Sequence, residues 1–306
     1  MLVTVLICTW NRVPLLAGTL ARLEVLTIPA GCRWELLVID NGCTDGTAAL
    51  LTARRKRLPL RVECEPRLGI ACARNRGLEA ARGDLVLLTD DDTLVDPGWL
   101  AAYVAALGRW PEAAYFGGQI DPLFERPPAR WLAANRASFR PMLSAIDLEG
   151  RERPIGGGEQ PYGPNMALRR AAIGGVRLDE RLGRRGGEQV RGSDVHLVEQ
   201  LRRRGCRGAW IPAARVQHVV PPERASLAYA WRYHEGMGRT RVRLRPDDLG
   251  LGAAAIGVGR GLAGAALKAL AGRRDWPVHL ARAAHFVGCW REQARRGGDR
   301  AAEARA

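Results

Sequence analysis

The stretch GDLVLLTDDDTLVDPGWL, residues 83–100, places three successive aspartates directly after a strand-like apolar run. Leu85 to Thr89 are all apolar or β-branched, and Asp90, Asp91 and Asp92 follow them. Two like charges about 4 Å apart repel by about 1 kcal/mol in water and by about 4 kcal/mol near a protein surface. Unless a cation lies between them, this repulsion raises the pKa of at least one carboxyl group. We therefore expect a positive partner at this position.

The first hundred residues alternate strand-like and helix-like segments. Strands are expected over 3–7, 34–40, 58–65 and 84–90, and helices over 14–26, 47–57 and 69–83. The strands are near-continuous apolar runs, which is typical of a parallel sheet covered by helices on both faces. Because ligands of such sheets bind beyond the carboxyl ends of the strands, we expect Thr9–Asn11, Asp40 and Asp90–Asp92 along one edge.

The rest of the chain has weaker patterns. Residues 117–190 are rich in glycine and proline, which indicates loops and short strands built around a site. A helix is expected to begin at Ser193 and to end at Gly205, and two strand-like runs, GAWIP and ARVQHVV, follow it. From about residue 246 the chain is expected to be helical and basic. At 306 residues it is long enough for one large α/β domain or two small ones.

The chain carries a net charge of +15, and the excess is uneven. Residues 202–245 hold 11 arginines and 2 acidic residues, a balance that suits nucleotide phosphates, anionic lipid or nucleic acid. Residues 245–306 hold 11 basic and 6 acidic residues, on expected helices with small and apolar faces. Such helices can lie on an anionic membrane surface, or they can pack on the domain as an ordinary helical cap.

Other features bear on the compartment. The seven cysteines are scattered and form no CxxC pair, so neither a disulfide framework nor a zinc site is expected, as fits a reducing cytosol. The opening MLVTVLICTWNR indicates a first strand rather than a signal peptide. The longest apolar run, residues 251–270, is interrupted by Arg260 and Lys268, so no membrane-spanning helix is expected.

One glycine motif is set aside. The run GVGRGLAGAA, residues 257–266, has the glycine spacing of a dinucleotide-binding loop. No strand clearly precedes it and no βαβ unit surrounds it, which that motif requires. We interpret it as a flexible helical hairpin.

Carboxylates spaced by one residue at a strand end, such as Asp90 and Asp92, can face one divalent cation. Oxygen-only ligation suits Mg²⁺ or Mn²⁺, which can be shared with a substrate diphosphate. The simpler alternative is a solvated turn before a helix cap at Asp96.

Other candidate residues also have simple alternatives. Asp40 can cap the turn that Asn41 and Gly42 form, and Asp194 can cap the helix that starts beside it. His218 lies on a strand-like run, where a histidine is often a core residue. Arg74 and Asn75 can meet a diphosphate or line a solvent-exposed face.

Together these motifs resemble glycosyltransferase family 2, the inverting nucleotide-sugar transferases with the GT-A fold, over residues 2–245. The resemblance rests on several ordered motifs: VLICTWNR, LLVIDNGCTDGT, GIACARNRGLEAARGD, LVLLTDDDTLVDPGWL, GPNMALRRAAI, RLDERLG and GSDVHLVEQLRRRG. There are departures: Cys43 stands where serine is usual, and Ser193 where glutamate often precedes the aspartate.

The resemblance implies an α/β fold of GT-A type, with a mostly parallel nucleotide-binding sheet flanked by helices and a basic helical C-terminal extension. It implies a glycosyltransferase domain over 1–245, divided into a nucleotide-binding half (1–116) and an acceptor and catalytic half (117–245). Residues 246–306 are then the basic helical extension.

The resemblance also implies residue roles. Asp194 is the catalytic base that takes the proton of the acceptor hydroxyl, with Glu188 or Glu199 as an alternative. Asp90, Asp92 and His218 hold Mn²⁺ or Mg²⁺. The donor-binding residues are Thr9, Trp10, Asn11, Arg12, Asp40, Arg74, Asn75, Asp90, Asp91 and Asn165.

The implied activity is the inverting, metal-dependent transfer of a sugar from a nucleotide-sugar, by family habit a UDP-sugar, to a hydroxyl acceptor. A saccharide or lipid-linked acceptor would be met in the cytoplasm, at the inner membrane, in bacterial surface polysaccharide or glycan synthesis. A sugar-phosphate nucleotidyltransferase would carry a GGxGTRL-type loop where this chain has CTWNR. A nucleic-acid-binding protein would not gather acidic residues at the strand ends, so no nucleic acid partner is expected. A catalytically inactive relative would not keep Asp40, Asp90, Asp92 and Asp194 together.

Overall fold

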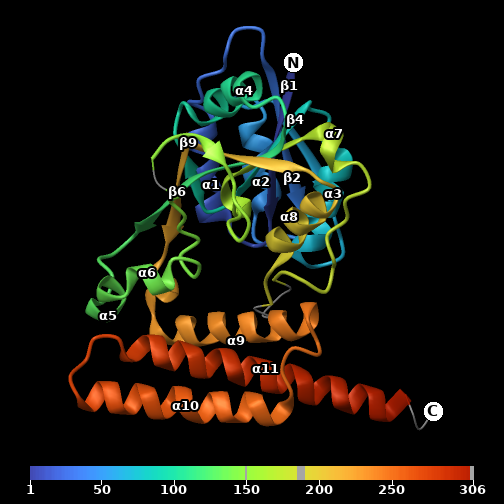
Figure 1. Cartoon of the computed structure of the whole chain (residues 1–306). Coiled ribbons are helices and arrows are strands. Elements are labelled where there is room, and N and C mark those ends of the chain that lie inside the picture. Colours follow the sequence, from blue (N-terminus) through green and yellow to red (C-terminus); the bar gives the residue numbers. More distant parts are fainter. Residues whose placement is uncertain (149, 185–189, 304–306) are drawn as a thin grey trace. The chain divides into compact units, whose positions relative to one another are not determined.

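The computed structural model describes residues 1–148, 150–184 and 190–303, with side chains as far as residue 298 (Figure 1). The strands are β1 (Leu2–Thr9), β2 (Arg33–Asp40), β3 (Leu60–Cys64), β4 (Leu85–Asp90), β5 (Thr93–Val95), β6 (Ala113–Phe124), β7 (Arg153–Pro154), β8 (Met166–Arg169) and β9 (Arg207–Val220). The helices are α1 (Val13–Leu23), α2 (Thr47–Arg54), α3 (Ile70–Ala80), α4 (Trp99–Arg109), α5 (Arg130–Ala134), α6 (Arg136–Phe139), α7 (Arg170–Ile173), α8 (Ser193–Arg203), α9 (Leu227–Leu244), α10 (Leu251–Leu270) and α11 (Trp276–Glu303), with short 3₁₀ turns at Gly163–Asn165 and Pro222–Ala225.

The N-terminal half forms the parallel part of a single sheet. Neighbouring strands follow the order β3-β2-β1-β4, and each of these pairs is parallel. Most residues of β1 and β4 are buried, as expected for apolar strands covered on both faces. Helix α3 packs against β1 and β2. The predicted α/β sheet flanked by helices is confirmed, with the bounds of the first elements shifted by a few residues.

The second half of the sheet is antiparallel, which makes the whole sheet mixed. The order continues from β4 through β8, β6 and β9 to β5, and β7 pairs with β9. Strand β8 runs antiparallel to both β4 and β6, and β5 runs antiparallel to β9. The two runs predicted between 208 and 220 form one strand, β9. Strands β6 and β8 lie partly or wholly in the region where the sequence indicated loops and short strands.

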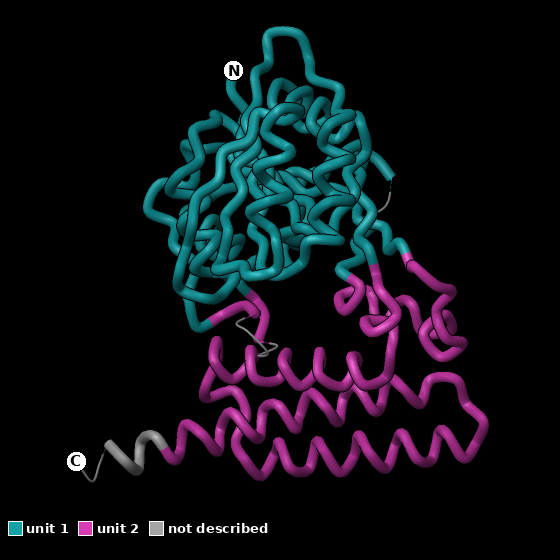
Figure 2. Tube along the Cα trace, turned by 180° about the vertical axis from the view of Figure 1, so that it is seen from behind, with its two compact units in different colours: residues 1–123, 144–181, 193–219 teal, residues 124–143, 182–192, 220–306 magenta. Residues whose placement is uncertain are grey.

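The described chain divides into two compact units (Figure 2). The first consists of residues 1–123, 144–181 and 193–219, and it holds nearly all of the sheet. The second consists of residues 124–143, 182–192 and 220–306. The division by contacts therefore falls at residue 219, whereas a functional domain boundary at 245 stays a prediction.

Three long helices make up most of the second unit. Helix α11 packs along both α9 and α10, and both views show it between them (Figures 1 and 2). The glycines of residues 257–266 lie inside the continuous helix α10, so the interpretation of this run as a flexible hairpin is wrong. The hairpin instead consists of the whole of α10 and α11, joined at residues 271–275.

Candidate active site

The structure confirms that the polar residues after the first parallel strands lie along one edge of the sheet, at the carboxyl ends of these strands. Strands β1, β2 and β4 end at Thr9, Asp40 and Asp90. In the strand register Thr9 pairs with Asp40, and Cys8 pairs with Asp90. The parallel strands thus bring their carboxyl ends, and the polar residues that follow them, to one line within the first unit.

Two of the three successive aspartates have Arg12 as their positive partner. Its Nη1 donates to Asp91 Oδ1 at 2.6 Å, and its Nη2 lies 3.0 Å from Asp92 Oδ2. Thr9 Oγ1 donates to Asp91 Oδ2 at 2.9 Å. Burial raises the pKa of Asp91 to about 6, against the opposing effect of Arg12. The expected cation is therefore supplied, for Asp91 and Asp92, by a residue 79 positions away from Asp91.

The backbone of this acidic turn is fixed from α1. Thr19 Oγ1 donates to the carbonyl oxygen of Asp91 at 3.0 Å and accepts from the N–H of Thr93 at 3.2 Å. Sequence reasoning missed Thr19. The available signal was a threonine on the apolar face of an amphipathic helix, and Thr19 is fully buried.

Asp92 meets His218 across the antiparallel pair β5–β9. Thr93 pairs with His218 in the register, and His218 Nε2 lies 3.4 Å from Asp92 Oδ1. Both side chains are nearly completely buried, at 2% and 1% exposure. The structure therefore brings together two of the three predicted metal ligands, which are far apart in the sequence.

The spacing of these two atoms fits a shared divalent cation. Octahedral ligands at about 2.1 Å from an ion lie about 3.0 Å from each other, close to the 3.4 Å between Asp92 and His218. No group of three or more histidine, cysteine, aspartate or glutamate side chains among the described residues has the arrangement of a metal site. Since Mg²⁺ commonly takes one or two carboxylates together with substrate phosphates, a substrate would have to complete such a site.

The third aspartate, Asp90, is joined to Asp194 through Arg74. Arg74 Nη2 donates to Asp90 Oδ1 at 3.2 Å, and its Nη1 donates to Asp194 Oδ1 and, at 3.1 Å, to Ser193 Oγ. The Arg74 side chain is 7% exposed, whereas those of Asp90 and Asp194 are 29% and 24% exposed. A buried guanidinium thus holds two accessible carboxylates near each other, and either carboxylate can accept a proton or bind a polar ligand.

Gly163 completes this arrangement, and sequence reasoning missed its role. Its N–H donates to Asp194 Oδ2 at 2.9 Å, so both oxygens of Asp194 are oriented. A Cβ at this position would collide with the guanidinium of Arg74 and lie 3.0 Å from Asp194 Oδ1. Only glycine allows this close approach.

Asn75 and Asn165, predicted as donor-binding residues, have their amides engaged inside the protein. Asn75 bonds to both the N–H and the carbonyl of Leu178. Asn165, fully buried, accepts from Trp99 Nε1 and Tyr103 Oη, each at 2.7 Å, and donates to two backbone carbonyls. These are the four hydrogen bonds an amide can make. The hydrogen bonds of both asparagines are typical of residues that support the fold. Contact of Asn75 and Asn165 with a donor stays a prediction.

The remaining predicted donor residues lie at the mouth of the strand edge. Asp40 Oδ1 accepts from the N–H of Cys43 at 2.8 Å, so the simple capping role is present. Asn11 has a left-handed backbone (φ 52°) and accepts from the N–H of Thr44 at 2.7 Å. Trp10 is 39% exposed, which leaves its ring open to stacking. Of the alternative bases, Glu199 lies on α8, and Glu188 falls outside the described residues.

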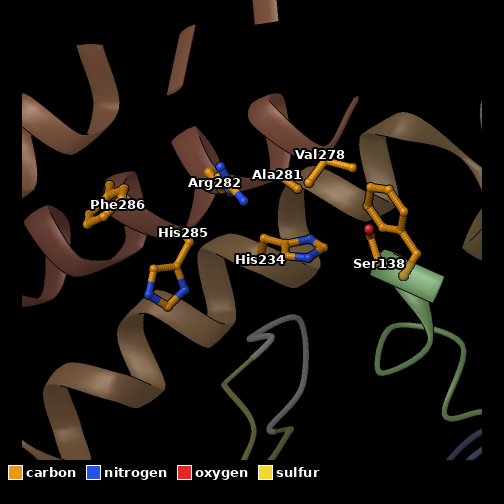
Figure 3. Close-up of a pocket in the computed structure, with 8 residues that line it drawn as sticks. Ser138, His234, Val278, Ala281, Arg282, His285 and Phe286 are labelled. Atoms are coloured by element: carbon orange, nitrogen blue, oxygen red, sulfur yellow. The ribbon is translucent and has the colours of Figure 1, made fainter. Parts of the chain in front are cut away.

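A separate cavity of about 250 Å³ lies in the second unit (Figure 3). It is bounded by α6, α9 and α11, and most of its wall is apolar. The lining residues are Ser138, Phe139, His234, Val278, Ala281, Arg282, His285 and Phe286. Burial lowers the pKa of both histidines, that of His285 to about 4. None of these residues belongs to the strand edge, so the cavity is distinct from the aspartate site.

Two solved structures share this fold. The mannosyltransferase PcManGT from Pyrobaculum calidifontis, in complex with GDP-Man and Mn²⁺, matches with a TM-score of 0.63 and 20% identity, over 95% of this chain and 86% of that one. S. aureus TarS 1–349, in complex with UDP, matches with a TM-score of 0.56 and 16% identity, over 97% and 92%. The fold of this chain is therefore that of the GT-A glycosyltransferases.

The sequence comparisons identify the family. The model for glycosyl transferase family 2 matches residues 4–172, and the chain belongs to this family. The succinoglycan biosynthesis protein ExoM of Rhizobium meliloti is 31% identical over 243 residues, which cover 78% of this chain and 73% of the relative. The glucosyl-dolichyl phosphate glucuronosyltransferase of Haloferax volcanii is 28% identical over 50% of this chain and 48% of its own length.

Proposed function

We propose that the protein transfers a sugar from a nucleotide-sugar to a hydroxyl group of a saccharide or lipid-linked acceptor, with inversion at the anomeric carbon. The observation that carries this proposal is the bridge of Arg74 between Asp90, at the strand edge, and Asp194, on α8. A donor bound at Asp90 and an acceptor activated at Asp194 would then meet within one small site. A UDP-sugar is the donor that we would test first.

On the donor side, the strand edge offers the contacts that a nucleoside diphosphate needs. The exposed ring of Trp10 can stack on the base, and the half-buried Asp40 can accept from a uracil imide. Asp90, which is partly exposed, can accept from the ribose hydroxyls. Arg12 and Arg74 supply positive charge where the diphosphate would lie.

A divalent cation, Mn²⁺ or Mg²⁺, would be held by Asp92 and His218, with Asp90 as the third protein ligand. The ion would stabilise the negative charge that develops on the leaving diphosphate. Support comes from the 3.4 Å spacing of the Asp92 and His218 atoms and from the Mn²⁺ bound in PcManGT. Arg12, which contacts Asp91 and Asp92, would fix both carboxylates in position.

On the acceptor side, Asp194 would take the hydroxyl proton while the acceptor oxygen forms its bond to the anomeric carbon. The bond to the nucleoside diphosphate breaks in the same step, on the opposite face of the sugar. Arg74 and the N–H of Gly163 orient both oxygens of Asp194. A positioned general base of this kind typically contributes about 10²- to 10⁴-fold to the rate.

The acceptor and the location are inferred from the relatives and from the basic helices. One relative is named for succinoglycan biosynthesis and another for a dolichyl phosphate substrate. By analogy we propose a lipid-linked acceptor in bacterial surface polysaccharide or glycan synthesis. The enzyme would then work at the cytoplasmic face of the inner membrane, in peripheral contact with anionic lipid.

The base is tested by comparing Asp194→Asn with Glu199→Gln, a change on the same helix. With UDP-sugars as donors and a membrane extract as acceptor source, Asp194→Asn should lower kcat about 10²- to 10⁴-fold. Binding of UDP should stay within about twofold, because Asp194 acts on the acceptor. If Glu199→Gln abolishes turnover and Asp194→Asn does not, the assignment of the base is wrong.

A further inference from the structure

Helix α10 has the reverse of the usual distribution of side-chain size. Its buried face is a stripe of small residues: Ala254, Gly257, Gly261 and Ala265. Its exposed face carries the large apolar residues, with exposures of 46% for Leu251, 58% for Ile256, 45% for Leu262, 68% for Leu267 and 87% for Leu270. Soluble helices normally turn their large apolar residues inward.

The small stripe explains how α10 is held. A Cβ on Gly261 would lie 2.7 Å from the backbone nitrogen of Ala283, and one on Gly257 would overlap the ring of Phe286. The two helices therefore approach closely along the stripe, and α11 lies between α10 and α9 (Figures 1 and 2). This packing leaves the leucine-rich face of α10 without cover from the described residues.

The charged residues within α10 itself are all basic. Residues 251–274 contain four basic residues and no acidic residue. Arg260, Arg273 and Arg274 are exposed, and Asp275 lies 3.2 Å from Lys268 and 3.7 Å from Arg273. Large apolar side chains flanked by exposed cations complement a bilayer surface that presents anionic headgroups above hydrocarbon.

We infer that the outer face of α10 docks on an anionic membrane, with the helix lying in the plane of the interface. The inference rests on the proposed function for its purpose, access to a lipid-linked acceptor. The exposed apolar side chains enter the acyl region of the bilayer: Leu251, Ile256, Leu262, Leu267 and Leu270. The exposed arginines bind lipid phosphates: Arg260, Arg273 and Arg274.

The packing of α11 against the middle of α10 argues against α10 crossing the membrane. Helix α10 has 20 residues, most of them apolar, so length and composition alone would allow it to span a membrane. Its middle residue Gly261 lies against Ala283, next to the exposed Arg282 of α11. Spanning would carry Arg282 and Arg260 to the centre of the bilayer, where charged side chains are costly.

The test is flotation of the purified full chain with vesicles, in the absence of donor and acceptor. Vesicles of phosphatidylglycerol and phosphatidylcholine in equal amounts should bind the protein, and phosphatidylcholine alone should bind it much less. The double variant Leu267→Asn, Leu270→Asn should lower the partition coefficient about 100-fold. Val25→Asn, a change of another exposed apolar residue (56%) in the first unit, should leave it unchanged.

Three results would overturn the inference. One is equal partition of the double variant and the wild type at equal melting temperature. Another is a dimer that the same double variant converts to a monomer, with no vesicle binding by either, which would make this face an interface between two copies. The third is resistance of the native protein to carbonate extraction, which would indicate a spanning helix. UDP binding, measured in parallel, reports separately on the proposed function.

Discussion

The guanidinium of Arg74 bonds to the carboxylate of Asp194, although 120 residues separate them in the chain. The same guanidinium reaches Asp90 at 3.2 Å, so one buried side chain connects the end of β4 with the start of α8. In the proposed reaction these are the donor side and the acceptor side. Arg74 therefore sets the distance between the two halves of the site.

Arg74→Lys should keep the charge but lose this bridge, because one ammonium cannot reproduce the planar geometry of a guanidinium. We expect kcat to fall by about tenfold or more and the free energy of unfolding to fall by about 2 kcal/mol. Arg76→Lys is the matched control, since Arg76 lies on the same helix, is 44% exposed and pairs with Glu63. Equal effects of the two changes on kcat would contradict the role of Arg74.

Gly163→Ala should disturb the same pair from the other side. The added methyl group would collide with the Arg74 guanidinium, so either that side chain or the Gly163 backbone must shift. We expect about tenfold loss of kcat, with a loss of unfolding free energy of about 1–3 kcal/mol. Gly157→Ala, where the new methyl group meets open space, should change neither value. Full activity of Gly163→Ala would show that the close approach is dispensable.

Asn165→Ala separates a scaffold role from a donor-binding role. The change would remove the side-chain partner of Trp99 Nε1 and of two backbone carbonyls, and it would leave Tyr103 Oη with only the backbone oxygen of residue 165, at 3.2 Å. Chemical denaturation should show a loss of about 3 kcal/mol or more, since each unsatisfied buried group costs about 1–3 kcal/mol. Affinity for UDP should be unchanged below the melting temperature. Lost affinity at unchanged stability would instead support direct contact with the donor.

The cavity histidines should make stability fall on acidification. Burial, with the charge of Arg241 and of His234, lowers the pKa of His285 to about 4, below its ordinary value of 6.5. Between these pH values the unfolded chain takes up a proton that the folded chain does not, so the folded state loses stability as the pH falls. Between pH 6.5 and pH 4, the free energy of unfolding of His285→Gln should fall less than that of the wild type, by on the order of 1 kcal/mol. Urea denaturation at each pH measures this difference. Identical pH profiles would show that His285 titrates normally.

The parallel sheet and its polar edge were predictable because their signals are local. Strands β1, β2 and β4 are short apolar runs, each followed by polar residues, and parallel pairing brings such ends together. The partners across the site were not predictable in the same way. The pairing of Arg12 with Asp91, and of Arg74 with Asp194, depends on tertiary packing over 79 and 120 residues.

Helix α9 shows a second limit. Its buried residues include Tyr229, Tyr233, Gly236 and Thr240 rather than a run of aliphatic side chains. The apolar periodicity of this segment is therefore weak in the sequence. The clearer signal is the many arginines between 202 and 245, which indicate only a basic surface. Asn165 shows a third limit, because the sequence does not reveal that its amide points into the core.

The most direct test of the central claim is calorimetric titration of UDP into the protein, with and without Mn²⁺. Binding in the micromolar range that requires the metal is expected. Asp92→Asn and His218→Gln should each abolish it, whereas Asp96→Asn, which changes a nearby exposed aspartate, should not. If UDP, GDP and dTDP all fail to bind in the presence of metal, the three aspartates are not a donor site and the proposed function is wrong.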